Sequence, residues 1–576
     1  MDIKQQILIA GIFMMSFVLW NKWDRFSAEI NNNSNTISYE QQQLSPTGNP
    51  VPTGNSTPDI PNESDVPLVS EPTITDTINA VPVPQTQSAI AKYITVETDL
   101  IIAKINTQGG GIESLKLKKQ AEKAETPDVK FALLKNTPAE IFISQSGLIG
   151  NNGQYPNHNT LYFSEKDNYQ LTEEKTEIIV PLRWVSENGM VFSKAFIIRR
   201  DSYLIDIKFN AENTLTTPWK GYFYAQFKRS QPVDLQRGSL IQLPSFMGGV
   251  QYTPQDKYKK VSFKDISKEN LNLKTQTGWI GMLQHYFAGV WLAEPSQTNN
   301  YKFYSKYLDH PNQPKYIMGF QQQTPLSLNP GQSGSIETKV FIGPKEQSRL
   351  NKIEEEKNIE GLALTVDYGW LTVIAEPLFW ILDRVNDVVK NWGWAIIILT
   401  ILIKLAFYPL SAASYRSMAR MKKLQPRMET LKERFGDDRA ALQQEMMKLY
   451  KEEKVNPAGG CLPILIQVPV FIALYYVLLE SVEMRHAPFA LWLQDLSSKD
   501  PYFILPILMG ASMMLQFRLN PTPMEPIQQR IMMIMPIVMT FLFVSFPSGL
   551  VLYWVVNNIL SIAQQWAINR RIVKEK

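Results

Sequence analysis

The chain contains 576 residues, with a formal net charge of +4 and one cysteine, Cys461. This length exceeds what one ordinary hydrophobic core holds, so at least two domains are expected. The small net charge argues against direct sequence-specific binding of nucleic acid, and a single cysteine excludes an internal disulfide bond.

Residues 1–23 contain an apolar run at 7–20. A cleaved secretory signal and an uncleaved transmembrane anchor both fit such a run. No small-residue cleavage site follows it, and Trp20 and Trp23 suit the membrane interface. We therefore expect an uncleaved N-terminal anchor.

Residues 24–90 are rich in Asn, Ser, Thr, Gln and Pro and contain few aromatic residues. Such a segment cannot bury enough apolar surface to offset its conformational entropy. It is predicted to be a disordered tether that carries no chemistry.

Residues 91–345 show the alternation that is typical of strands. The stretch 203–209 places Ile205, Ile207 and Phe209 on one face. Turns are predicted at 199–202 and at 109–111. Further strand candidates are GYFYAQFKR, YKFYSKYL, YIMGFQ and GSIETKVFIG. Their spacing predicts an all-β sandwich, and no motif within it indicates a binding site.

Residues 346–391 are predicted to form a helical connector that ends in an amphipathic helix. Apolar residues recur at helical spacing after Trp370, and Glu376, Asp383 and Asp387 lie between them. These charges argue against a membrane crossing. The helix is expected to lie along the outer membrane surface.

A five-helix core is predicted over residues 392–568. Its apolar runs are 392–410, 461–479, 502–519, 531–546 and 550–567. Each approaches the length needed to cross a bilayer, so six transmembrane helices are expected with the N-terminal anchor.

Lys and Arg are concentrated in the segment 414–455 and in the tail 569–576. The positive-inside rule places both in the cytoplasm together with the N-terminus. The tether and the sandwich then lie outside, which is the periplasm in a bacterium with two membranes. The predicted location is the bacterial inner membrane.

Lys404 lies inside the first run of this core, where a charge costs about 2.5–3.5 kcal/mol. It could extend its ammonium toward the cytoplasmic headgroups, or it could line a water-accessible cavity. Thr400 and Tyr408 share its helix face. The six runs contain no Asp or Glu. The ammonium is therefore expected to attract a polar or acidic group of a passing polypeptide, a lipid headgroup or an anionic solute.

The other runs carry polar residues that are individually ordinary in helix packing. Together they are expected to line a hydrophilic pocket around Lys404. They are Gln467, Ser512, Gln516, Asn557, Asn558, Ser561, Gln564 and Gln565.

The basic segment 414–455 divides at Gly436, where Asp437 or Asp438 can cap a second helix. Apolar stripes on both halves predict a cytoplasmic helical hairpin. A solvated loop held by anionic lipid and a docking arm both remain open. The basic residues assigned to docking are Arg416, Arg420, Lys422, Lys423 and Arg427.

The sequence contains no phosphate-binding loop, no H-E-x-x-H and no G-x-S-x-G. Its four histidines lack metal-ligand spacing. We expect no enzyme activity, no catalytic residues, no cofactor and no metal.

Several motifs resemble the YidC/Oxa family of membrane protein insertases, in its long Gram-negative form. They include NWGWAIIILT, YPLSAASYRSMARMKKLQP, VNPAGGCLPILIQVPVFIALYYVL and FPSGLVLYWVVNN. The resemblance implies an insertase and chaperone for newly made membrane proteins. Such a protein acts alone or beside the SecYEG translocon and receives chains from the ribosome and the targeting machinery.

The resemblance also implies site residues. The substrate groove would contain Lys404, Thr400, Gln467, Tyr553, Trp554 and Asn557. The surface on which a substrate helix slides would contain Val468, Pro469, Ile531 and Met535. Relatives commonly carry arginine where this chain has Lys404, so the charge is kept without the planar guanidinium.

Two other functions remain open at this point. A secondary transporter of an anionic solute would use Lys404 as its binding charge, although no inverted repeat is visible. An envelope assembly scaffold would act through the sandwich.

Overall fold

The fold was examined in a computed structural model. It describes residues 65–67 and 90–574, except 151–154, 232–245, 296–299, 310–312, 436–437, 454–461 and 520–525. The predicted anchor at 1–23 and most of the predicted tether lie outside the described residues.

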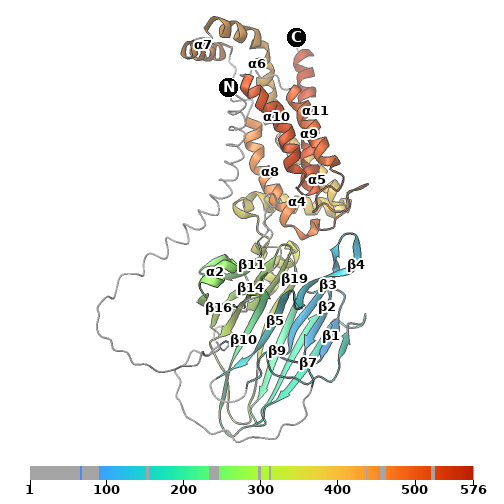
Figure 1. The fold of residues 1–576 in the computed structure, drawn as a ribbon, viewed down its shortest axis with the longest axis vertical. Helices are drawn as coiled ribbons and strands as arrows, with labels where there is room; N and C mark the ends of the chain where they lie inside the picture. Colours follow the sequence, from blue (N-terminus) through green and yellow to red (C-terminus); the bar gives the residue numbers. More distant parts are fainter. Residues whose placement is uncertain are drawn as a thin grey trace, which may run out of the picture.

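Two packed β-sheets form the first half of the described chain (Figure 1). The larger sheet has eleven strands in the order β13-β16-β17-β10-β5-β4-β3-β2-β1-β6, with β18 paired to β10. These are β1 (Tyr93–Glu97), β2 (Ile101–Asn106), β3 (Gly111–Lys123), β4 (Thr126–Asn136), β5 (Ile141–Ile149), β6 (Asn168–Gln170), β10 (Trp219–Ser230), β13 (Asn272–Thr275), β16 (Tyr301–Leu308), β17 (Lys315–Gln322) and β18 (Leu326–Leu328).

The smaller sheet has eight strands in the order β12-β11-β14-β15-β19-β9-β8-β7. These are β7 (Glu177–Val185), β8 (Val191–Arg199), β9 (Leu204–Glu212), β11 (Gly248–Thr253), β12 (Lys257–Val261), β14 (Gly278–Gln284), β15 (Phe287–Ala293) and β19 (Ser333–Pro344). A short helix, α2 (Phe263–Lys268), lies between β12 and β13.

The predicted strands and turns form this sandwich. β8 and β9 are antiparallel neighbours, with Ile198 opposite Ile205, and β2 turns into β3 through Gly109 and Gly110. Side chains alternate between buried and partly exposed along β8. The inward faces of the two sheets supply one hydrophobic core, and each buried large side chain contributes about 1.5–3 kcal/mol.

Lys194, on β8, is fully buried in this core. Its Nζ donates to the carbonyl oxygens of Gly110, at 2.5 Å, and Ser146, at 3.2 Å. The ammonium also lies 5.0 Å from the ring centroid of Phe209. Burial lowers the pKa of Lys194 to about 7.

Helices form the second half. They are α3 (Gln347–Lys357), η2 (Ala363–Thr365), η3 (Gly369–Leu371), α4 (Thr372–Val389), α5 (Trp392–Ala406), α6 (Tyr408–Phe435), α7 (Arg439–Glu452), α8 (Leu462–Glu480), η5 (Val482–Met484), α9 (Ile504–Leu519), α10 (Pro526–Phe543) and α11 (Ser548–Lys574). Figure 1 places α6 and α7 at the end of the molecule farthest from the sandwich.

Within the described residues, no single helix is both long and apolar enough to cross a membrane by itself. A bent pair meets that test: Trp392–Ala406 and Tyr408–Met421, which meet at 65°. Shorter apolar helices are Gln467–Glu480, Ile504–Arg518 and Met533–Phe543.

The run 392–410 was expected to be one helix, and the structure breaks it at Phe407. Pro409 lies two residues after the break, and proline has no N–H with which to continue the helical hydrogen bonds. Tyr408 therefore opens a new helix and is exposed, so it does not share a continuous face with Lys404.

The sandwich is joined to the helical region through the end of α8. Lys345, directly after β19, donates from Nζ to the Thr365 carbonyl at 3.0 Å and forms an ion pair with Glu480 at 3.3 Å. His285 Nε2 donates to the Leu479 carbonyl at 2.9 Å. These contacts tie the sandwich to the C-terminal turn of a core helix.

Arg485, beyond that turn, extends the junction to β3. Its guanidinium donates to Gln120 Oε1 at 3.1 Å and to the Glu122 carbonyl at 3.2 Å. It also lies over the rings of Phe131 and Phe287, which stack on each other.

Candidate functional site

The lysine site begins with the start of α5. Asn391 caps this helix, because its Oδ1 accepts from the Trp394 N–H at 3.1 Å. Lys404 follows Thr400 by four positions, so both lie on one helix face, and both are buried. That face packs against α11.

Lys404 contacts a neutral partner. Its Nζ donates to Ser561 Oγ on α11 at 2.8 Å, and Ser561 Oγ donates to the Asn557 carbonyl at 2.7 Å. Lys404 is 8% exposed, and among the described residues no carboxylate forms an ion pair with it. An ammonium has three donors, so this contact leaves others for a ligand.

Amide groups of α8 and α11 surround this contact. Gln467 Nε2 donates to Asn557 Oδ1. Gln564 Nε2 donates to the Lys404 carbonyl at 3.4 Å. Ser561 thus connects Lys404 to Asn557, and Asn557 contacts Gln467. These three predicted groove residues belong to one hydrogen-bonded group.

A cavity of about 20 Å³ adjoins the lysine, with Phe407, Ser411 and Gln467 in its lining. This volume holds about one water molecule.

The other predicted groove residues make different contacts. Thr400 Oγ1 donates to the Ile396 carbonyl of its own helix at 2.6 Å. Trp554 packs edge-on against Phe471, with ring centroids 4.4 Å apart, and Tyr553 lies parallel to the same ring at 6.1 Å. Thr400 stays near the lysine, whereas the two aromatic residues pack toward α8.

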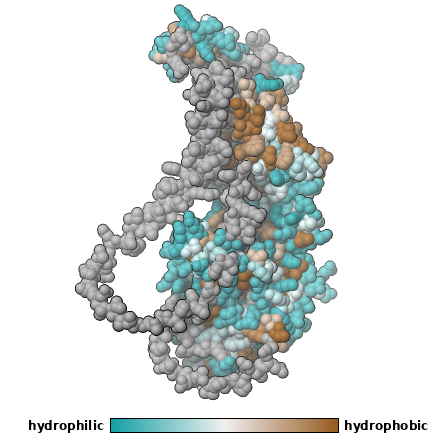
Figure 2. All heavy atoms as spheres, viewed as in Figure 1, coloured by the Kyte–Doolittle hydropathy of each residue, from teal (hydrophilic) through white to brown (hydrophobic). Residues whose placement is uncertain are grey.

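The predicted slide residues lie on α8 and α10. Val468 is exposed, and Pro469 and Met535 are half-buried. Ile531 belongs to α10, and its side chain lies outside the described part. Figure 2 shows an apolar band over the helical region, between polar surfaces. Exposed members on α10 include Met533, Ile534, Ile537, Val538 and Phe541.

The basic segment forms two helices, α6 and α7, in contact with each other. Asp438 caps α7, because its Oδ1 accepts from the N–H groups of Ala440 and Ala441 at 3.0 Å each. A small core joins the helices through Met421, Leu424, Met428 and Leu449.

The predicted docking residues Arg416, Arg420, Lys423 and Arg427 are exposed, and Arg427 pairs with Glu453 at 2.5 Å. The Lys422 side chain lies outside the described part.

Two family models cover nearly all of the described chain. Residues 93–381 match the one described as YidC periplasmic domain, and residues 384–575 match the one described as 60Kd inner membrane protein. Relatives of the whole chain carry the description Membrane protein insertase YidC. One from Alkalilimnicola ehrlichii is 49% identical over 482 residues, covering 84% of this chain and 83% of the relative.

A second, from Azotobacter vinelandii, is 42% identical over 576 residues and covers 100% of this chain and 99% of its own. The chain belongs to the YidC family of membrane protein insertases. A solved structure described as an active YidC insertase with the first transmembrane domain resolved is 19% identical. It covers 83% of this chain and 92% of its own, with a TM-score of 0.36.

Within this YidC-family chain, sequence reasoning did not single out the partner of the lysine. Ser561 is one of the eight polar residues predicted to line the pocket, and nothing in its local sequence distinguishes it. Tyr415 also reaches this site, since its hydroxyl donates to the Ser561 carbonyl at 3.5 Å. Residue separations of about 150 positions hide both contacts from any local pattern.

Proposed function

We propose that this YidC-family chain inserts newly made inner-membrane proteins by attracting their acidic translocated segments to Lys404. The proposal includes six membrane crossings, with both termini in the cytoplasm. It also includes cooperation with the SecYEG translocon, and contact of the α6–α7 hairpin with ribosomes or anionic lipid.

The contact between Lys404 and Ser561 carries this proposal. A hydroxyl is a neutral partner, whereas a carboxylate would form a stronger, charge-assisted hydrogen bond with the same ammonium. Burial removes competing water from the ammonium. The site therefore favours an acidic ligand that arrives from outside the chain.

The free energy of an ion pair is comparable with the cost of moving a charge into the bilayer. At an effective dielectric constant near 20, an ion pair at 4 Å contributes about 4 kcal/mol before desolvation. A charge at the centre of a bilayer costs about 2.5–3.5 kcal/mol on insertion scales. One ion pair with Lys404 can thus offset much of the cost of carrying one carboxylate across.

The hydrophobic segment of the substrate would leave along α8 and α10. Val468 and the exposed apolar residues of α10 offer a surface that matches lipid tails and a substrate helix equally well. Met535 adds a flexible side chain that adapts to different partners.

Insertion of a single-span substrate with an acidic translocated tail tests the role of Lys404. We expect Lys404→Ala to lower the protease-protected fraction several-fold and Lys404→Arg to stay near wild type. When Asn replaces the acidic residues of the substrate tail, Lys404→Ala should lower the protected fraction much less.

Lys352→Ala, which removes an exposed positive charge on α3, is the matched control and should insert both substrates normally. Wild-type insertion of the acidic substrate by Lys404→Ala would contradict the proposal. Equal loss with both substrates would show a structural role for the lysine instead.

A further inference from the structure

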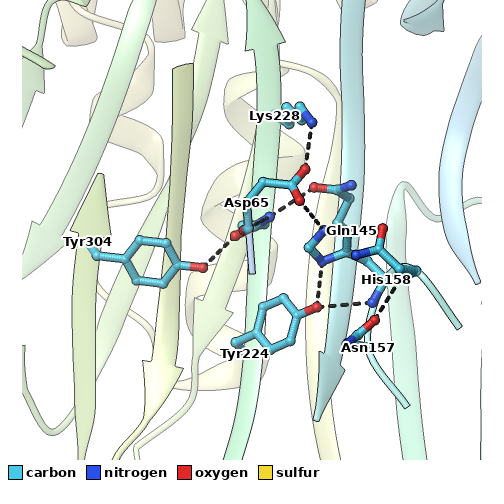
Figure 3. Close-up of polar contacts among 9 residues, drawn as sticks. Asp65, Gln145, Asn157, His158, Tyr224, Lys228 and Tyr304 are labelled. Atoms are coloured by element: carbon cyan, nitrogen blue, oxygen red, sulfur yellow. Dashed lines mark hydrogen bonds and ion pairs between the residues drawn. The ribbon is translucent and has the colours of Figure 1, made fainter. Parts of the chain in front are cut away.

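The outer face of the larger sheet carries a polar pocket (Figure 3). Alternate residues of β10 point to this face, among them Tyr224, Gln226 and Lys228, while the residues between them enter the core. Gln145 on β5 and Tyr304 on β16 flank them. Local sequence patterns do not reveal this site, because its residues come from three strands and a loop.

His158 reaches the pocket from the loop between β5 and β6. Gly147 lets this loop lie close to β5, since a Cβ there would meet the Asn157 Cα at 2.7 Å. The His158 backbone N–H donates to the Tyr224 hydroxyl at 3.1 Å, and that hydroxyl lies 2.5 Å from Nδ1. Nε2 contacts a carboxylate, which can only accept, so Nε2 carries a proton that points into the pocket, while Nδ1 shares a hydrogen bond with the Tyr224 hydroxyl.

Two groups of the sandwich orient the Gln226 amide. The Tyr304 hydroxyl donates to its Oε1 at 2.6 Å, and its Nε2 donates to Gln145 Oε1 at 2.9 Å. Gln226 is fully buried. The orientation of this amide is thus set by two contacts that need no ligand.

The occupant of the pocket is Asp65, from the segment expected to carry no chemistry. His158 Nε2 donates to Asp65 Oδ1 at 2.9 Å, and Lys228 Nζ pairs with Oδ2 at 2.5 Å. Gln226 Nε2 also donates to the Asp65 backbone carbonyl at 3.2 Å. Both carboxylate oxygens and the backbone of one residue are recognised.

Asp65 and Lys228 form a pair of opposite charges that is largely buried. The Asp65 side chain is 16% exposed and that of Lys228 is 17% exposed. Burial raises the pKa of the Asp65 carboxyl, but hydrogen bonds from His158 and Lys228 and the positive charge of Lys228 lower it by more, so that it lies well below its usual value. Among the described residues, Asp65 is the ion-pair partner of Lys228.

We propose that this pocket is a binding site for an aspartate within an extended acidic peptide, and that Asp65–Val66–Pro67 of the same chain is its resident ligand. Fewer than thirty residues separate Asp65 from the start of β1. A connection of this kind gives an effective concentration on the order of 1 mM. A separate peptide at micromolar concentration should therefore enter only when the resident segment is removed.

A labelled peptide spanning residues 60–70, IPNESDVPLVS, tests the site in the full chain in detergent micelles by fluorescence polarisation. We expect the Asp65→Asn chain to bind this peptide at least tenfold more tightly than the wild-type chain. The same peptide with Asn in place of Asp65 should bind at least tenfold more weakly to that variant. Adding Lys228→Met to the Asp65→Asn chain should abolish binding.

Asp167→Asn provides the matched control, because it removes an exposed carboxylate of the sandwich that pairs with Lys92. It should leave peptide binding as in wild type. Equal binding of the Asp and Asn peptides by the Asp65→Asn chain would overturn the proposal.

A second measurement does not depend on peptide affinity. In a chain with Cys461→Ser and Val66→Cys, the rate of maleimide labelling reports the release of the resident segment. Asp65→Asn and Lys228→Met should each raise this rate several-fold, and Asp167→Asn should not. An unchanged rate in both variants would show that the contact does not hold the segment.

Discussion

Three lysines are buried among the described residues, and each has a different class of partner. Lys404 donates to a hydroxyl, Lys194 to two carbonyls, and Lys345 to a carbonyl and a carboxylate. Of these three, within the part of the chain that the structure describes, only the pair of Lys345 and Glu480 balances charge. Burial lowers the pKa of Lys345, and Glu480 offsets part of that effect.

Lys194 should make the stability of the sandwich depend on pH. Its pKa is about 7 in the fold and ordinarily about 10.5, so between these values the unfolded chain binds more protons. The free energy of unfolding should therefore rise with pH, by about 1.4 kcal/mol per unit, and be flat below pH 7. Denaturant unfolding followed by the fluorescence of buried Trp279 and Trp291 measures this dependence.

Lys194→Met should remove this pH dependence and raise stability at pH 7. Lys116→Met, at an exposed position on β3, should retain the wild-type slope. An identical slope in wild type and Lys194→Met would show that the buried ammonium does not titrate in this range.

At the scale of elements, the α6–α7 hairpin depends on very little apolar packing. Among its described side chains, four buried ones join the helices, and Met446 and Tyr450 cover them partly. The exposed basic residues on α6 lie outside this small core. Pairing of the helices should therefore be lost by a single truncation that leaves the rest of the molecule folded.

Leu449→Ala should cost about 2–5 kcal/mol, enough to separate α7 from α6. Amide hydrogen exchange across residues 439–452 should accelerate strongly, while exchange in the sandwich stays unchanged. Lys451→Ala, an exposed change on the same helix, serves as the control. Wild-type protection of α7 in Leu449→Ala would mean that other contacts hold the hairpin.

At the scale of the whole molecule, the junction at α8 decides whether sandwich and helices behave as one unit. The side chains of Lys345 and Glu480 are 4% and 12% exposed. Removing one partner of such a buried pair leaves an uncompensated charge in the interior. The backbone carbonyls at the C-terminal end of α8 also favour the positive groups of the sandwich that lie beside them.

Glu480→Gln should destabilise the chain by about 3–5 kcal/mol and lower its thermal midpoint in detergent. The double variant Lys345→Met/Glu480→Gln should recover much of that loss, because no unpaired ammonium remains. Glu356→Gln, at an exposed surface pair, is the control. Additive effects of the two junction substitutions would rule out the pairing.

Local patterns sufficed for features that depend on neighbouring residues. The alternation at 203–209 predicted β9, and the acidic residue after Gly436 predicted the cap at Asp438. The family resemblance supplied the groove residues, of which Gln467 and Asn557 lie in contact.

The features that were missed depend on residues far apart in the chain. Asp65 meets His158 across 93 positions and Lys228 across 163. The amino-acid composition of residues 24–90 does not reveal such a contact. Complementary charges elsewhere in the chain can stabilise a single aspartate within a polar segment. The break at Phe407 was also missed, since the apolar run continues through it.

The bend at Phe407 makes α6 a lever whose pivot lies one turn from Lys404. A 28-residue helix is about 42 Å long, so a tilt of about 6° at the pivot moves its far end by about 4 Å. A force applied at that far end would therefore act on the bend beside Lys404 through the full length of the helix.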